Sequence, residues 1–305
     1  MSHNKKEYAK FFRRPIFSSL AKGKDISDLF GSFDSYCYET LFSNNDNNEH
    51  EISLRDLFTS LYDFLRLNYR NEYVYKTALV NKIIFGKHSP KTSSSSIELP
   101  IKNSIVDVAV FNGTSTAYEI KTEYDSPKRL ITQAPDYLDV FDKVYIVTHP
   151  EYASKYCALN LPRVGVMVLN KKDQLSVIKE ADSNIDYIKS DSLFSVLRKE
   201  EFLAIIEDYT STKINMPNGL VYEYCKEIFM QMPLNIANKY FISAMKKRCN
   251  DKVFLDYIYS LPACLRVLGY ATPLSRKQKE FIMNLMDVNK SLSEISCSLL
   301  SLFEN

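Results

Sequence analysis

Glycine and tryptophan are scarce in this sequence, and their scarcity excludes several common functional classes. The 305 residues include 7 glycines and no tryptophan. Neither G-x-x-x-x-G-K-[ST] nor G-x-G-x-x-G occurs, so the glycine-rich loops that commonly bind nucleotide phosphates are missing. No run of about 18 apolar residues occurs either, so we expect no membrane-spanning helix and no membrane partner.

Cysteine and histidine are also few and scattered. The six cysteines include no C-x-x-C pair, and the four histidines include no H-x-x-x-H pair. A zinc site and a histidine-dependent hydrolase therefore lack the residues that they need. In a chain of this length we expect free thiols, as in a cytoplasmic protein in a reducing compartment.

Strong charge of one sign is missing as well. The net charge is +2, so no strong overall field attracts a polyanion. Lysine and arginine are concentrated in residues 1–24, where Glu7 is the single acid. A phosphate-contacting arm and a solvated basic terminus both fit this segment. It has no apolar stretch, so we do not expect a secretory signal.

Two kinds of hydrophobic pattern divide the chain into three parts. An Asn-rich break, Ser43–His50, ends a basic N-terminal segment of residues 1–50. Strand and helix patterns alternate through residues 51–190, and helical patterns fill residues 191–305. We predict an α/β protein whose mixed sheet is flanked by helices, with N-terminal helices and a C-terminal all-helical domain.

Individual elements can be placed within the α/β part. The predicted strands are Ile97–Pro100, Ile105–Phe111, Thr116–Thr122, Lys143–Thr148 and Val164–Leu169. Predicted helices begin after the N-cap Ser53 and cover Asn71–Phe85, Pro127–Phe141 and Pro150–Leu159. The Ser-rich run Lys91–Ser96 is expected to be a flexible connector.

The strongest functional signal lies in the predicted hairpin Ser104–Thr122. Asp107 is on its first strand, and Glu119 and Lys121 share one face of the second because strand side chains alternate. A two-residue Asn-Gly loop would place the two carboxylates on opposite faces of the hairpin. A three-residue loop or a bulge would place Asp107 opposite Glu119. A shared site therefore requires the longer loop or the bulge.

Two carboxylates and an amine on one face can hold a divalent metal and orient water. Hard oxygen ligands favour Mg²⁺ or Mn²⁺, and the bound metal makes water more acidic and stabilises charge on a phosphodiester. Lys121 can orient or help to deprotonate that water, and the backbone carbonyl of Ile120 is a further ligand. The alternative interpretation is an ordinary surface ion pair between Glu119 and Lys121.

The helix predicted after the hairpin carries a polar stripe. Arg129, Gln133 and Tyr137 recur at a spacing of four residues and so share one face. Lys128 and Arg129, at the start of this helix, are placed to contact phosphate. Pro135 is expected to kink or end the helix and to misalign Tyr137 with Gln133.

The order Asp107, Glu119-Ile-Lys121 and Gln133-x-x-x-Tyr137 resembles the PD-(D/E)xK nuclease superfamily. The Gln-x-x-x-Tyr element is similar to that of its RecB-like branch. Tyr-Glu-Ile-Lys, followed by the Gln/Tyr helix and Phe-Asp-Lys-Val-Tyr-Ile-Val, resembles small uncharacterised bacterial members. The similarity covers about residues 70–150, and Val106 stands where the proline of the superfamily's name would be.

This resemblance implies a restriction-endonuclease-like core with its metal at Asp107 and Glu119. It also implies a further carboxylate from the preceding helix, for which Glu72 is the candidate and Glu98 the alternative. Lys76, one turn after Glu72, is a candidate nucleic-acid contact, although an ion pair between these two residues explains them equally well.

In the superfamily the helix glutamine and tyrosine support the catalytic lysine or the substrate phosphate. The resemblance assigns these supporting roles to Gln133 and Tyr137.

We therefore predict a Mg²⁺- or Mn²⁺-dependent nuclease, and the resemblance favours DNA over RNA as the partner. The first alternative is a catalytically silent module of the same fold that binds nucleic acid or a protein. The second is an interaction factor that forms homodimers or binds a protein partner through its C-terminal helices.

Overall fold

The structure is a computed structural model that describes residues 6, 8–23, 51–123 and 125–291. The described parts of residues 1–81 and 252–305 form one compact unit, and residues 82–251 form a second. The predicted boundaries after residues 50 and 190 do not coincide with these units, because helices after residue 190 pack against the sheet. Residues 24–50 of the predicted N-terminal segment lie outside the described residues.

The first unit is built mainly of helices. They are α2 (Arg14–Ala21), α5 (Leu54–Asn68), α6 (Glu72–Leu79), η5 (Ala263–Leu265), α13 (Lys252–Ser260), α14 (Arg266–Ala271) and α15 (Arg276–Met286). Strands β1 (Glu51–Ser53) and β8 (Asn289–Ser291) pair antiparallel. The Ser53 side chain accepts a hydrogen bond from the Asp56 amide, so the predicted N-cap is confirmed. The π-helical segment η1 (Val80–Lys87) continues α6.

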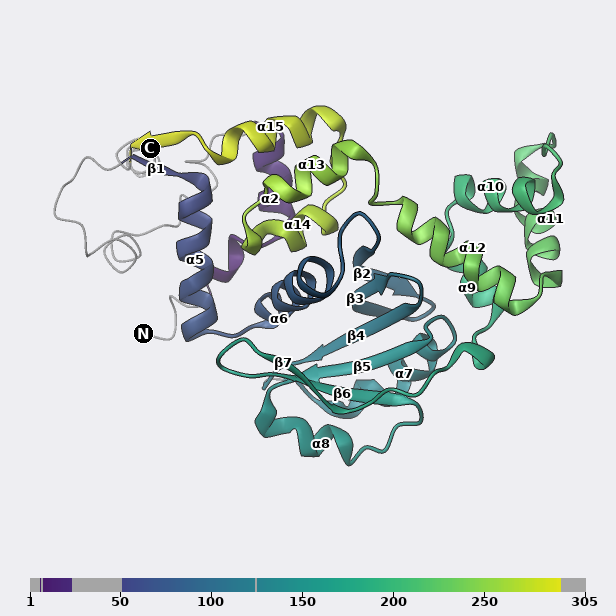
Figure 1. Ribbon diagram of the computed structural model, residues 1–305, viewed down its shortest axis with the longest axis horizontal. Helices are drawn as coiled ribbons and strands as arrows, with labels where there is room; N and C mark the ends of the chain where they lie inside the picture. Colours follow the sequence, from purple (N-terminus) through teal and green to yellow (C-terminus); the bar gives the residue numbers. More distant parts are fainter. Residues whose placement is uncertain (1–5, 7, 24–50, 124, 292–305) are drawn as a thin grey trace, which may run out of the picture. The chain divides into compact units, whose positions relative to one another are not determined.

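The second unit is centred on a six-stranded sheet with the strand order β2-β3-β4-β5-β6-β7 (Figure 1). Its strands are β2 (Ser94–Ile101), β3 (Ser104–Phe111), β4 (Ser115–Lys121), β5 (Lys143–Thr148), β6 (Val164–Leu169) and β7 (Leu175–Lys179). Strands β2 to β4 pair antiparallel, β4 to β6 pair parallel, and β7 is antiparallel to β6. The predicted mixed sheet flanked by helices is confirmed.

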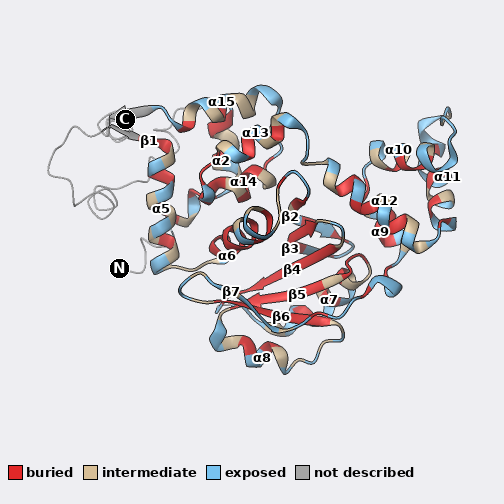
Figure 2. Cartoon of the chain, viewed as in Figure 1, coloured by how far each residue is buried: buried red, intermediate tan, exposed pale blue. Residues whose placement is uncertain are grey.

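The helices of the same unit are η2 (Pro127–Arg129), α7 (Leu130–Leu138), η3 (Pro150–Tyr152), α8 (Ala153–Cys157), η4 (Ile185–Tyr187), α9 (Ser190–Val196), α10 (Lys199–Thr210), α11 (Asn218–Gln231) and α12 (Leu234–Lys247). Among them, α7, α8, α9 and α12 contact the sheet, and α11 packs against α9 and α10. Leu130 and Ala134 of α7 share a buried cluster with Ala117 of β4 and Ile146 of β5. Strands β3 to β6 are largely buried, whereas β7 is mostly exposed, as Figure 2 shows.

The Ser-rich run was predicted wrongly as a flexible connector. Ser94 and Ser95 begin β2 and are buried. Their hydroxyls donate to the carbonyls of Met245 and Ala109 at 3.0 and 3.1 Å, so the cost of burying them is offset. Phe241 of α12 packs edge-on against Phe111 of β3 in the same region, with ring centroids 5.8 Å apart.

Gly165 on β6 offers a test of how closely the backbone of this strand is packed against Tyr145 and Ala181. A Cβ atom there would lie 2.5 Å from the Tyr145 ring and 2.6 Å from the Ala181 amide nitrogen. Because the second neighbour is backbone, Gly165→Ala is expected to lower the free energy of unfolding by about 1–3 kcal/mol. Urea denaturation would measure this change in the free energy of unfolding. The control is Gly219→Ala, where a Cβ atom would meet nothing within 4 Å. Equal stability of the two variants would contradict the packing.

Two predictions from composition can be compared with the described residues. None of the described helices is long and apolar enough to cross a membrane. Cys157, Cys225, Cys249 and Cys264 form no disulfide bond among the described residues, and the other two cysteines lie outside these residues.

Candidate active site

The β3–β4 hairpin has the loop that a shared carboxylate site requires. The ladder pairs Phe111 with Ser115 and Val108 with Tyr118, which leaves a three-residue loop at residues 112–114. Its Asn112 amide donates to the Thr114 carbonyl at 3.1 Å. The same register, extended by one residue, places position 107 opposite position 119. The predicted odd-numbered loop is confirmed.

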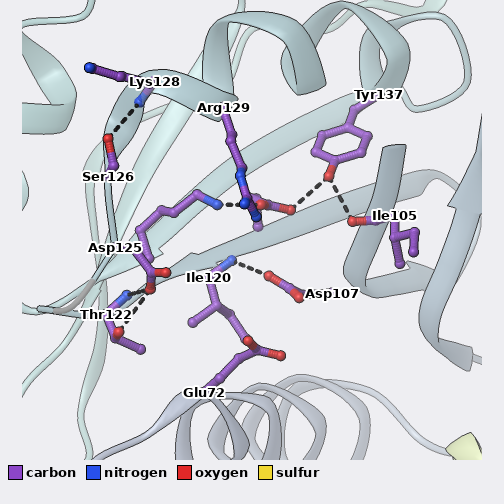
Figure 3. Close-up of polar contacts among 12 residues, drawn as sticks. Glu72, Ile105, Asp107, Ile120, Thr122, Asp125, Ser126, Lys128, Arg129 and Tyr137 are labelled. Atoms are coloured by element: carbon purple, nitrogen blue, oxygen red, sulfur yellow. Dashed lines mark hydrogen bonds and ion pairs between the residues drawn. The ribbon is translucent and has the colours of Figure 1, made fainter. Parts of the chain in front are cut away.

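Asp107 lies where the strand ladders on both sides of it are interrupted. The β2–β3 register skips Glu98, the residue opposite Asp107, whose φ of 53° is left-handed. On the other side, the half-buried Asp107 carboxylate accepts a hydrogen bond from the Ile120 amide at 2.8 Å (Figure 3). The carboxylate therefore takes the place of a backbone acceptor at the end of the β3–β4 ladder. The hydrogen bond thus holds the Asp107 carboxylate next to Ile120, the residue between Glu119 and Lys121.

Glu119 and Lys121 form a buried ion pair. Their side chains are 4% and 9% exposed, and Lys121 Nζ lies 2.6 Å from Glu119 Oε1. The interpretation as an ordinary surface pair is therefore wrong. Burial of two charges is costly unless they are paired and hydrogen-bonded, and an apolar pair often stabilises a core at least as well. Retention of both charges in a sheet core favours a functional role.

Tyr137 of α7 completes the hydrogen bonding of Glu119. Its hydroxyl lies 2.8 Å from Glu119 Oε2 and 2.8 Å from the Ile105 carbonyl oxygen, so one proton faces two acceptors (Figure 3). Burial raises the pKa of Tyr137 well above its usual value, and the charge of Glu119 raises this pKa further. The phenol therefore stays protonated and acts as a donor to the carboxylate.

Pro135 does not end the helix before Tyr137. Helix α7 continues through it to Leu138, with Pro135 and Ile131 both on the exposed side. The carbonyl of Ile131, which loses its amide partner, can therefore be hydrated, and this lowers the cost of an internal proline. The expectation that the helix ends at Pro135 was wrong, and Tyr137 reaches Glu119.

The other predicted residues of this helix differ from Tyr137 in their contacts and in their exposure. Gln133 does not join the Glu119 hydrogen bonds, and in the described part of the chain its buried Oε1 has no hydrogen-bond partner. Lys128 and Arg129 are exposed at the start of the helix. In the view of Figure 3 the Arg129 side chain extends toward the middle of the labelled group, and the Lys128 side chain extends away from it.

Glu72 and Lys76 belong to the first unit and form an ion pair one helical turn apart. The structure thus contains the ion pair that the sequence analysis gave as the alternative to a metal or nucleic-acid role. Their predicted metal and nucleic-acid roles stay predictions. Glu98, the alternative third carboxylate, is exposed on β2 in the second unit.

Two supporting contacts were not predicted from the sequence. Thr148, at the end of β5, donates its hydroxyl to the Lys121 carbonyl at 2.7 Å. Asp125 Oδ2 accepts from the Thr122 amide and hydroxyl at 2.7 and 2.8 Å, which closes the turn after β4 (Figure 3). The Thr-x-x-Asp spacing is a local signal for such a turn, whereas the Thr148 contact depends on strand order.

The donor set can be compared with the needs of Mg²⁺, which takes one or two protein carboxylates and fills its remaining positions with water and substrate phosphate. Asp107 and Glu119, on neighbouring strands, match this requirement. Among the described residues, no group of three or more Asp, Glu, His or Cys is arranged as a metal site. Both Glu119 oxygens contact Lys121 or Tyr137, so a cation there requires Lys121 to move. By kind and number, these two carboxylates meet the requirement of Mg²⁺ once Lys121 has moved away from Glu119.

Comparison with known proteins identifies relatives without defining a chemistry. The family described as bacteriophage P4 protein cII matches residues 65–263, more than half of the chain. Protein cII of Enterobacteria phage P4 is 27% identical over 145 residues, or 47% of this chain and 53% of that protein. The chain thus spans about half the length of this curated relative. No solved structure gives a significant match.

Proposed function

The chain belongs to the bacteriophage P4 protein cII family, and we propose, from the geometry of its candidate active site, that it is a metal-dependent nuclease. One observation carries the proposal: the buried Glu119 carboxylate is held by Lys121 and Tyr137, with Asp107 fixed on the neighbouring strand. The name of the phage relative states no activity. The proposal therefore rests on these side chains.

The proposed reaction is hydrolysis of a phosphodiester bond in nucleic acid, with DNA preferred to RNA because of the motif resemblance. Asp107 and Glu119 would hold Mg²⁺ or Mn²⁺, which when bound acidifies water and stabilises charge on phosphate. Lys121, released from Glu119, would orient the attacking water. Tyr137 keeps the Glu119 side chain in place, and Arg129 neutralises phosphate charge.

The fold gives this proposal further support. The carboxylates lie on adjacent antiparallel strands of a mixed sheet, and α7 supplies the tyrosine beneath them. A restriction-endonuclease-like core requires this combination, and we infer that architecture for the core predicted from the sequence, residues 51–190.

A second function is favoured by one contact. The Lys121 ammonium sits directly on Glu119, where it already neutralises the carboxylate without a metal. A catalytically silent module that binds nucleic acid or a protein partner would keep this arrangement unchanged.

Metal dependence separates the two functions. The full chain is incubated with labelled single-stranded and duplex DNA and RNA in Mg²⁺, in Mn²⁺ or in EDTA. The nuclease is expected to cleave nucleic acid in either metal and to stop in EDTA, because two carboxylates need a cation to activate water. Binding that is equal in all three buffers, without cleavage in any, would instead identify the silent module.

A further inference from the structure

The carboxyl ends of the three parallel strands lie along one edge of the sheet. The register aligns Lys121 of β4 with Thr148 of β5, and Thr148 with Val168 of β6. Neighbouring strands are about 4.8 Å apart, so the end of β6 lies on the order of 10 Å from Lys121. Open α/β sheets commonly bind their ligands at this edge. The candidate active site is therefore at one end of a short path that leads to the β6–β7 turn (Figure 1).

That turn presents two lysines on a fixed backbone. Asn170 Oδ1 accepts hydrogen bonds from the Lys172 and Gln174 amides at 2.9 Å each, and the Asn170 amide donates to the Gln174 carbonyl at 3.0 Å. Lys171 and Lys172 are both exposed, and within residues 125–291 neither forms an ion pair. A turn that is already ordered loses less entropy when its side chains bind a ligand.

The opposite end of the path is also basic. Arg129 is exposed, its side chain extends toward the middle of the labelled group in the view of Figure 3, and within the described residues no ion pair engages its guanidinium. Between the two ends, after β5, Glu151 lies 3.9 Å from His149 Nδ1, and these two residues form an ion pair only when the imidazole is protonated. The edge thus carries separated cations at its two ends.

We propose that the carboxyl edge of β4, β5 and β6 is a track for the backbone of a nucleic-acid strand. Arg129 holds a phosphate beside the active site, and Lys171 and Lys172 hold phosphates further along the strand. The proposal rests on the proposed function for the reaction at one end of the track. A phosphodiester chain fits because its charges repeat, so one ligand can meet separated, unpaired cations. Phosphate contacts of this kind fix position without reading sequence.

Paired charge removal tests the track. The variant K171Q/K172Q is compared with K239Q/K247Q, which removes the same charge from exposed lysines of α12 in the same unit. Binding of labelled single-stranded and duplex DNA to the full chain is measured in EDTA over a range of salt concentrations. The K171Q/K172Q variant should bind at least fivefold more weakly. Its slope of log affinity against log salt should fall by about 1.4 for single strands or about 1.8 for duplex. The α12 control should keep the wild-type slope.

The outcomes separate the track from the proposed function. Wild-type affinity and slope in K171Q/K172Q, or equal losses in both variants, would overturn the track even where cleavage is observed. Loss confined to K171Q/K172Q supports the track, and it does so even if the wild-type chain cleaves nothing in Mg²⁺ or Mn²⁺. A wild-type chain that neither binds nor cleaves would remove both proposals.

Discussion

Replacement of Asp107 by asparagine is expected to abolish metal-dependent cleavage while the fold stays intact. The asparagine oxygen can still accept the Ile120 hydrogen bond that now fixes the carboxylate at 2.8 Å. It lacks the negative charge that a hard cation needs. We expect kcat/KM for DNA in Mg²⁺ to fall by about 10³-fold or more, the scale on which loss of one key electrostatic group acts. Thermal unfolding of the variant should match that of the wild type.

The matched control is Asp136→Asn. Asp136 is also half-buried in the second unit, and its carboxylate accepts a hydrogen bond from the Ser104 hydroxyl at 2.6 Å. This variant loses the same charge near the same helix and should cleave at nearly the wild-type rate. Retained cleavage in Asp107→Asn would remove Asp107 from the metal site. Equal loss in both variants would show a general effect of charge instead.

The sequence sets a condition on the register of the site, because that condition depends on local chemistry, but it leaves the length of the loop open. Alternation along a strand places Glu119 and Lys121 on one face, and the hairpin loop decides whether Asp107 joins them. The structure has the three-residue loop that this argument required. The burial of the charges could not be derived in this way, because it depends on α7 packing under β4 and supplying Tyr137.

The predictions that were wrong involve packing between distant segments. Ser94 and Ser95 can lie in a buried strand because their hydroxyls donate hydrogen bonds to the carbonyls of Met245 and Ala109. Met245 is 151 residues from Ser94 in the sequence. Strand β7 has mostly exposed side chains, so no apolar alternation marked it. Pro135 was judged by its usual effect on a helix, whereas its exposed position in α7 allows the helix to continue. In each case the tertiary surroundings override a local preference.

Replacement of Lys121 by methionine is expected to destabilise the protein strongly. Methionine fills a similar volume but leaves the Glu119 carboxylate, 4% exposed, with Tyr137 and no cation. Removal of one partner from a buried ion pair costs about 3–5 kcal/mol, because the remaining charge is buried without compensation. The free energy of unfolding from urea denaturation measures this loss. The exposed Lys189, which pairs with Asp139, is the control, and Lys189→Met should leave stability near that of the wild type because Asp139 keeps its pair with Lys102.

A second substitution shows whether the uncompensated charge is the cause. In Lys121→Met/Glu119→Gln no buried charge remains at this point, and glutamine can still accept the Tyr137 hydrogen bond. The double variant should therefore recover most of the lost stability and lie within about 1 kcal/mol of the wild type, while cleavage stays absent. If the double variant were less stable than Lys121→Met alone, the loss would come from packing. A fully stable Lys121→Met would mean that the Glu119 carboxylate is hydrated, and the buried pair that supports the proposed function would not exist in solution.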